Sequence, residues 1–162
     1  MNKQSIAYSI IHEYLLGRYP TVESYDDRII AQKLGFLSQS FGIYVGDVKF
    51  FWHKRGPYSR ALTSLLFSIE KNKQDIIEEA SRFTIRDELK PRLNKVKKLI
   101  DKKPENCPEV YWLEICASLK YISAELSVKN GEKCKEVLLT RKNFLIEHED
   151  SIDFANSLLF QK

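Results

Sequence analysis

The sequence has few of the residues on which small secreted, fibrous or low-complexity proteins depend. Its 162 residues include three cysteines, five prolines and six glycines. Proline and glycine at these levels exclude a collagen-like or low-complexity chain. Cys107, Cys116 and Cys134 show neither a CxxC motif nor the Cys/His spacing of a zinc site. An odd number of cysteines without a pairing pattern is typical of a reducing compartment, so we expect a cytoplasmic protein.

Long apolar runs are lacking too. No uninterrupted apolar stretch approaches the ~18 residues of a transmembrane helix, so we expect no membrane association. His12 and Glu13 interrupt the apolar N-terminal segment, and we predict no signal peptide. Neither sign of charge is in large excess, with 26 Lys and Arg against 22 Asp and Glu, and 43% of the residues are hydrophobic. This composition excludes a disordered chain, and the length predicts a single domain over residues 1–162, which the apolar periodicity described below predicts to be helical.

Recognised catalytic motifs are absent as well. The sequence contains no GxSxG, GxGxxG, Walker A or HExxH pattern. His12, His53 and His148 lie in separate segments without a His or Cys at ligand spacing, so we expect no metal site and no cofactor. We therefore predict a protein that is not an enzyme. The alternative requires a cleft that joins Glu114, His53 and Arg55 and strongly shifts the pKa of the carboxyl group.

Apolar residues at helical spacing predict most of the secondary structure. The clearest stripe lies between residues 109 and 126, and other helices are expected over residues 5–16 and 26–41. Ser59 is a suitable N-cap for the helix that follows it. In total the pattern predicts six or seven helices, and helices this short depend on packing into one common core.

A different pattern covers the segment from Ile43 to Trp52. Its residues are mostly β-branched or aromatic, with Gly46 and Asp47 placed to form a turn. The predicted fold is therefore mainly α: a compact bundle of six or seven helices with a small β-hairpin or wing near residues 43–53.

The segment KFFWHKRGPYSR, residues 49–60, combines aromatic rings with arginines. Such combinations are typical of protein-binding hot spots and of surfaces that stack bases. The alternative is that the aromatic residues fill the core beneath the Gly-Pro turn. The predicted partner-binding residues are Phe51, Trp52, His53, Arg55, Gly56, Pro57, Tyr58 and Arg60.

Two groups of charged residues also stand out. Glu114 lies among apolar neighbours, and because a buried carboxylate needs a partner, we predict a salt bridge with Lys33, Arg55 or Arg60. Residues 86–103 hold eight Lys or Arg against three Asp or Glu. This segment is expected to contain a helix, and one face of that helix carries the candidate nucleic-acid contacts Lys95, Lys98 and Lys102. An acidic partner protein or a simply solvated face would account for the same lysines.

Two segments together resemble a known family. The first contains Gln32, Lys33, Leu34, Phe36, Leu37, Phe50, Gly56, Pro57, Tyr58, Ser59 and Leu62, and the second is WLEICASLKYI, residues 112–122, followed by a helix with Lys142, Phe144, Ala155 and Leu158. This pattern is similar to the YwgA-like proteins of bacteria, archaea and phages, which are distantly similar to the Panacea (SocA-like) antitoxin domain. The resemblance covers about residues 26–159. It implies a structural or binding centre formed by Gln32, Lys33 and residues 56–59, to which we add Glu114.

The resemblance also implies a class of function. Panacea domains are mostly helical and act as antitoxins by binding toxin proteins, some relatives are adaptors that present a toxin for proteolysis, and several YwgA-like proteins occur beside phage-defence genes. We therefore expect a non-enzymatic cytoplasmic module that binds a partner protein, a toxin or a subunit of a defence complex. The alternative is a nucleic-acid-binding protein or regulator. It requires the basic helix and the β-wing on the same side of the molecule.

Overall fold

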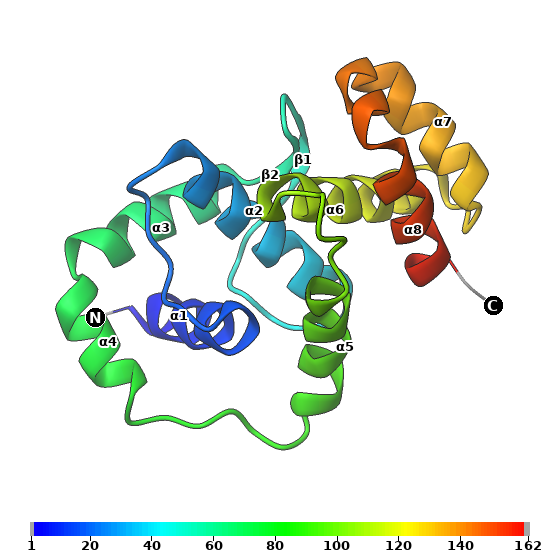
Figure 1. The fold of residues 1–162 in the computed structure, drawn as a ribbon. Helices are drawn as coiled ribbons and strands as arrows, with labels where there is room; N and C mark the ends of the chain where they lie inside the picture. The colour runs from blue at the N-terminus through cyan, green and yellow to red at the C-terminus, as the bar shows by residue number, and fades with distance from the viewer. Residues whose placement is uncertain (1, 161–162) are drawn as a thin grey trace.

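The computed structural model describes residues 2–160, and its architecture is mainly helical (Figure 1). The described chain forms eight α-helices, one 3-10 helix (Asn143–His148) and a hairpin of strands β1 (Phe51–His53) and β2 (Gly56–Tyr58). The helices are α1 (Lys3–Leu16), α2 (Tyr25–Ser40), α3 (Arg60–Lys71), α4 (Lys73–Ala80), α5 (Lys90–Asp101), α6 (Glu109–Leu126), α7 (Gly131–Arg141) and α8 (Glu149–Leu159). The predicted fold class is confirmed, with one helix more than expected.

Local signals set the helix ends. The side chains of Ser24 and Ser59 accept hydrogen bonds from the first turns of α2 and α3 and so satisfy amides that the helices leave free. At the end of α1, Gly17 adopts a left-handed conformation with φ of 77°. Pro91 lies in the first turn of α5, where its missing N–H costs no helical hydrogen bond.

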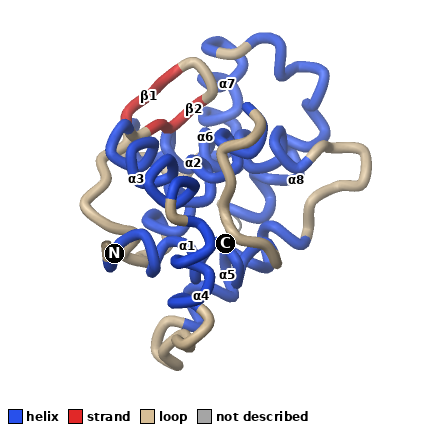
Figure 2. Tube along the Cα trace, turned by 90° about the vertical axis from the view of Figure 1, so that its left-hand side faces the viewer, coloured by secondary structure: helices blue, strands red, loops and turns tan. Residues whose placement is uncertain are grey.

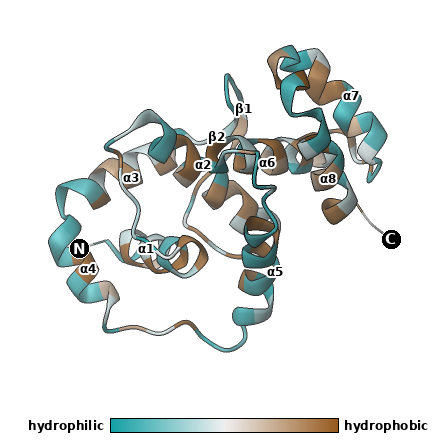
Figure 3. Cartoon of the chain, in the orientation of Figure 1, coloured by the Kyte–Doolittle hydropathy of each residue, from teal (hydrophilic) through white to brown (hydrophobic). Residues whose placement is uncertain are grey.

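The core centres on α2 and α6, which pack against each other in the middle of the molecule. Figure 3 shows hydrophobic residues along both helices, whereas α5 is largely hydrophilic. The largest fully buried side chain is Trp112 of α6, whose indole N–H donates to the carbonyl of Leu99, 3.0 Å away. Helices α1, α3, α4 and α5 lie to one side of this pair, and α7 and α8 cover the far end of α6 (Figure 1).

The hairpin lies later in the chain than predicted. Its two-residue turn is Lys54–Arg55, and β1 pairs with β2 in antiparallel register. The expected strands before residue 51 do not form: residues 43–50 run as an irregular connection with a bend at Gly46–Asp47. Ile43, Val45 and Val48 are buried. Burial against the helices, rather than pairing with a strand, therefore accounts for the β-branched residues of this segment.

No helix in residues 2–160 combines the length and the hydrophobicity needed to cross a bilayer.

Candidate binding site

Two neighbouring side chains of α2 fix the position of the hairpin. The Lys33 ammonium donates to the carbonyl of Pro57 at 2.8 Å. The Gln32 side chain accepts from the Ser59 amide at 2.9 Å and donates to the Ser59 carbonyl at 2.9 Å. Because these groups are buried, each bond satisfies a polar atom that water does not reach. Gln32 and Lys33 are thus joined by hydrogen bonds to residues 57–59, as expected of a structural centre, although residues 56–58 form strand β2 and the turn lies at Lys54–Arg55.

Gly56 brings the hairpin against α6 more closely than another residue could. Its φ is 95°, and a Cβ atom there would lie 2.6 Å from Ser118 Oγ. Both Gly56 and Pro57 are buried. The prediction that Gly56 and Pro57 contact a partner is therefore wrong. The helices already cover both residues, which hold the hairpin against the helices beneath it.

The crowding at Gly56 gives a stability prediction. Replacing Gly56 by alanine should lower the free energy of unfolding by about 2–3 kcal/mol, because the costs of a strained backbone and of a steric overlap are added together. Urea denaturation would measure the loss. Gly17→Ala is the matched control, since Gly17 also has a positive φ but a Cβ atom there would have no neighbouring heavy atom within 4 Å. Gly17→Ala should lower the free energy of unfolding by the cost of the strained backbone alone, about 1 kcal/mol.

A second variant isolates the steric part. Ser118 Oγ is buried and has no hydrogen-bond partner among the described residues, so Ser118→Ala removes the overlapping atom at little cost. Gly56→Ala combined with Ser118→Ala should recover part of the lost stability. Equal losses in Gly17→Ala and Gly56→Ala would contradict the close approach of the hairpin to α6.

A buried group of charges lies beneath the hairpin turn. Glu114 of α6 is fully buried, and its Oε1 accepts from Arg55 Nε at 2.8 Å and from Arg55 Nη2 at 2.7 Å. Lys142, which follows α7, places its Nζ 3.7 Å from Glu114 Oε2 and also donates to the carbonyl of Lys54. The predicted salt bridge of Glu114 is thus confirmed with Arg55. One carboxylate here faces three cations, because Lys33 belongs to the same group of charges.

The surroundings of these cations shift their pKa values. Burial lowers the pKa of Lys33 from its ordinary value to about 7; Glu114 acts in the opposite direction, and Lys142 and Arg55 lower it further. Burial likewise lowers the pKa of Lys142. For Arg55 burial opposes the charge, but the hydrogen bond to Glu114 and the charge interactions with Glu114, Tyr25 and Tyr111 together outweigh it, so the pKa is raised. The positive charge beneath the turn is therefore only partly compensated.

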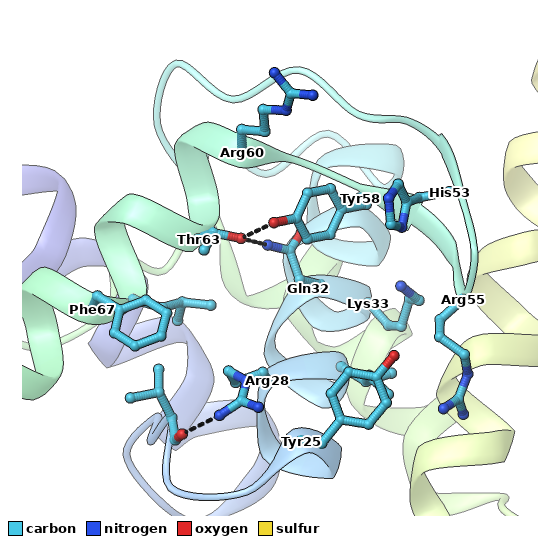
Figure 4. A pocket seen from close by; sticks show the side chains of 13 residues that line it. Tyr25, Arg28, Gln32, Lys33, His53, Arg55, Tyr58, Arg60, Thr63 and Phe67 are labelled. Carbon is cyan, nitrogen blue, oxygen red and sulfur yellow. Dashed lines mark hydrogen bonds between the residues drawn. The ribbon is translucent and has the colours of Figure 1, made fainter.

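Above this group lies a cleft of about 390 Å³ between α2, α3 and the hairpin (Figure 4). Its lining consists of Val22, Tyr25, Arg28, Ile29, Gln32, Lys33, His53, Arg55, Tyr58, Arg60, Thr63, Leu66 and Phe67. Four of these residues are Lys or Arg, and among residues 2–160 no Asp or Glu lines the cleft. The cleft therefore combines cations, aromatic rings and polar groups, a composition suited to an anionic ligand or partner.

The hairpin divides its aromatic residues between two faces. On the cleft side, the rings of Phe51 and His53 lie 5.8 and 5.0 Å from the ring of Tyr58, and the Arg60 guanidinium lies 6.0 Å from the Phe51 ring. Trp52 points the other way and is half-buried, with its ring 5.6 Å from that of Tyr121. The alternation of a β-strand produces this division. Trp52 therefore lies apart from the other predicted partner-binding rings.

Sequence reasoning missed several residues of the cleft. Tyr25 and Arg28 of α2 lie on the same helical face as Gln32, and Thr63 and Phe67 of α3 lie on the same face as Arg60. Their spacing of three or four residues was the available signal. For Lys142 no such signal exists, because only the tertiary fold brings it to Glu114.

The three lysines predicted as nucleic-acid contacts do gather in one place. Lys95, Lys98 and Lys102 line a second hollow, of about 310 Å³, together with Lys120, whose Nζ lies 5.0 Å from the centre of the Phe41 ring. The hairpin lies elsewhere: in both Figure 1 and Figure 2 it is at the top of the molecule, while α5 is in the lower half. The basic helix and the β-wing therefore do not form one continuous surface.

Comparison with protein-family models, curated proteins and solved structures found no match to this chain. Within residues 2–160, no three side chains of His, Cys, Asp or Glu are grouped as ligands of a metal ion.

Proposed function

We propose that this chain is a non-enzymatic module that binds a partner protein at the mouth of the cleft. One observation carries the proposal: two exposed aromatic residues, Tyr25 and Phe67, line a cleft that four cations and no carboxylate of the described chain line. A third exposed ring, that of Phe51, lies beside the cleft, 5.8 Å from the ring of Tyr58. Aromatic and Arg side chains supply most of the binding energy at protein interfaces. A partner with acidic side chains around an apolar contact would complement this surface.

The resemblance to the YwgA-like and Panacea proteins supports the same function. It suggests an antitoxin-like or phage-defence-associated role, with a toxin or a defence-complex subunit as the partner. A cytoplasmic location is part of this proposal. All three cysteines are buried and unpaired, as is usual for proteins of a reducing compartment.

The alternative, a nucleic-acid-binding protein, has less support. The lysines of α5 form a basic hollow, but the hairpin that carries Phe51, His53 and Tyr58 lies at the top of the molecule, while α5 is in the lower half. A phosphate-binding surface of this kind would act without the hairpin, through a salt-dependent interaction that does not depend on base sequence.

The test is affinity capture from the native cell lysate with and without nuclease. We expect a stoichiometric protein partner that survives nuclease, and recovery lowered about ten-fold or more by Phe51→Ala combined with Arg60→Ala, because such residues act as hot spots. Both side chains are exposed, so circular dichroism should show an unchanged helical signal. Arg55 is unsuitable for this purpose because its removal would leave the buried Glu114 with Lys142, 3.7 Å away, as its remaining ion-pair partner.

Arg82→Ala combined with Phe83→Ala is the matched control. It removes the same two residue types from exposed positions after α4, outside the lining of the cleft, and should leave capture unchanged. Equal losses in the two double variants would contradict docking at the cleft. Recovery of nucleic acid that Lys98→Ala abolishes would favour the alternative function.

A further inference from the structure

The interior of the cleft has a charge surplus that the protein does not neutralise. Lys33 is 2% exposed and uses one of its three N–H groups on the Pro57 carbonyl. Arg28 donates to the Val22 carbonyl at 2.8 Å, and Arg60 makes no salt bridge within the described chain. The nearby carboxylate of Glu114 is already shared between Arg55 and Lys142. An anion in the cleft would therefore meet several cations with unused donors.

The cationic groups alternate with aromatic rings. Figure 4 shows the rings of Tyr25 and Phe67 on either side of Arg28, with Tyr58 and His53 higher in the cleft. The guanidinium carbons of Arg28 and Arg55 lie 5.9 and 5.8 Å from the centre of the Tyr25 ring. Tyrosine and arginine planes in this arrangement accept a flat ring by stacking. The walls thus suit a ligand that has a planar part as well as a negative charge.

The volume and the charge of the cleft further restrict the class of ligand that fits. A volume of about 390 Å³ lies in the lower part of the range of small-molecule pockets, roughly 300–1,000 Å³. A phosphate monoester carries about −1.5 to −2 charges at neutral pH and offers three acceptor oxygens. It can therefore engage several of the cleft cations at once, whereas a single carboxylate carries one charge and two oxygens.

We propose that the cleft between α2, α3 and the hairpin binds a small phosphorylated ligand with a planar ring, the chemistry of a nucleoside monophosphate. The phosphate lies between Arg28 and Lys33, and the ring stacks against Tyr25 or Tyr58. This binding needs no partner protein, so its test is separate from the test of the proposed protein-binding function.

Isothermal titration calorimetry of the purified chain at low salt tests this assignment. The probes are the four ribonucleoside monophosphates, adenosine and inorganic phosphate. We expect at least one monophosphate to bind about ten-fold or more tightly than either adenosine or inorganic phosphate, because only the monophosphate uses both the cations and the rings. Absence of saturable binding by all four monophosphates would overturn the proposal.

Variants locate the site. Arg28→Gln, outside the buried charge group, should weaken monophosphate binding by about ten-fold, the loss of one charge-assisted contact. Lys98→Gln at the α5 hollow is the matched control and should bind like the wild type. If Lys98→Gln weakens binding and Arg28→Gln does not, the ligand belongs to the α5 hollow and the assignment is wrong. An oligoglutamate peptide that binds more tightly than every monophosphate would likewise overturn it and assign the cleft to an acidic protein segment.

Discussion

Replacing Glu114 by glutamine should lower the free energy of unfolding by about 3–5 kcal/mol, the usual cost of removing one partner from a buried ion pair. Glu114 is fully buried, and its carboxylate is the negative charge that Arg55 and Lys142 contact. Without it, Arg55, Lys142 and Lys33 remain close together in the interior with no compensating charge. Urea denaturation followed by circular dichroism would measure the loss.

Glu109→Gln is the matched control for this experiment. Glu109 lies on the same helix and also pairs with an arginine, Arg18, at 2.6 Å, but both side chains are partly exposed. Such a pair contributes roughly 0–1 kcal/mol. In contrast, Glu114→Gln combined with Lys33→Met should be more stable than Glu114→Gln alone, since one uncompensated cation is gone. If Glu109→Gln and Glu114→Gln lose equal stability, the charge group does not have the burial described.

Lys33 should make the stability of the protein depend on pH in a defined direction. Burial lowers its pKa in the folded state to about 7, whereas an unfolded lysine titrates at about 10.4. Between these values the unfolded chain binds more protons, so the contribution of Lys33 to stability rises with pH above about 7. Below that pH both states are protonated and the cost of the buried charge is largest.

The comparison with Lys33→Met isolates this effect from other titrating groups. The stability of Lys33→Met relative to the wild type should fall by about 3 kcal/mol between about pH 6 and about pH 9, as the wild-type lysine loses its buried charge. Lys95→Met, at an exposed position of α5, should keep a constant offset from the wild type over that range. Denaturant titrations of the wild type and the two variants at several pH values would measure these differences in the free energy of unfolding. A constant offset for Lys33→Met would contradict the lowered pKa.

Much of the helical framework was predictable because its signals are local. The apolar stripe of residues 109–126, the N-cap at Ser59 and the buried position of Glu114 all follow from neighbours within a few residues. The hairpin was not predictable to the same degree. β-branched residues at 43–48 have the same pattern whether they pair with a strand or pack against helices, and here they pack.

The candidate site was predictable only in part. The aromatic and basic character of residues 49–60 pointed to the hairpin, and Arg55 was among the cations expected for Glu114. The sequence did not reveal that Gly56 and Pro57 are buried or that Trp52 lies on the opposite face from Phe51. Each of these outcomes depends on which side of a three-residue strand meets the helices.

The sequence by itself therefore determined the fold class, the positions of several helices and the identity of the charged and aromatic residues near the turn. Only the tertiary structure decided that Lys142 joins Glu114, that α2 and α3 complete a cationic cleft, and that the lysines of α5 lie away from it. The physical reason is how far apart along the chain the interacting residues lie. Periodicity and capping record interactions between near neighbours, whereas a cleft depends on which faces of distant segments meet when the core packs.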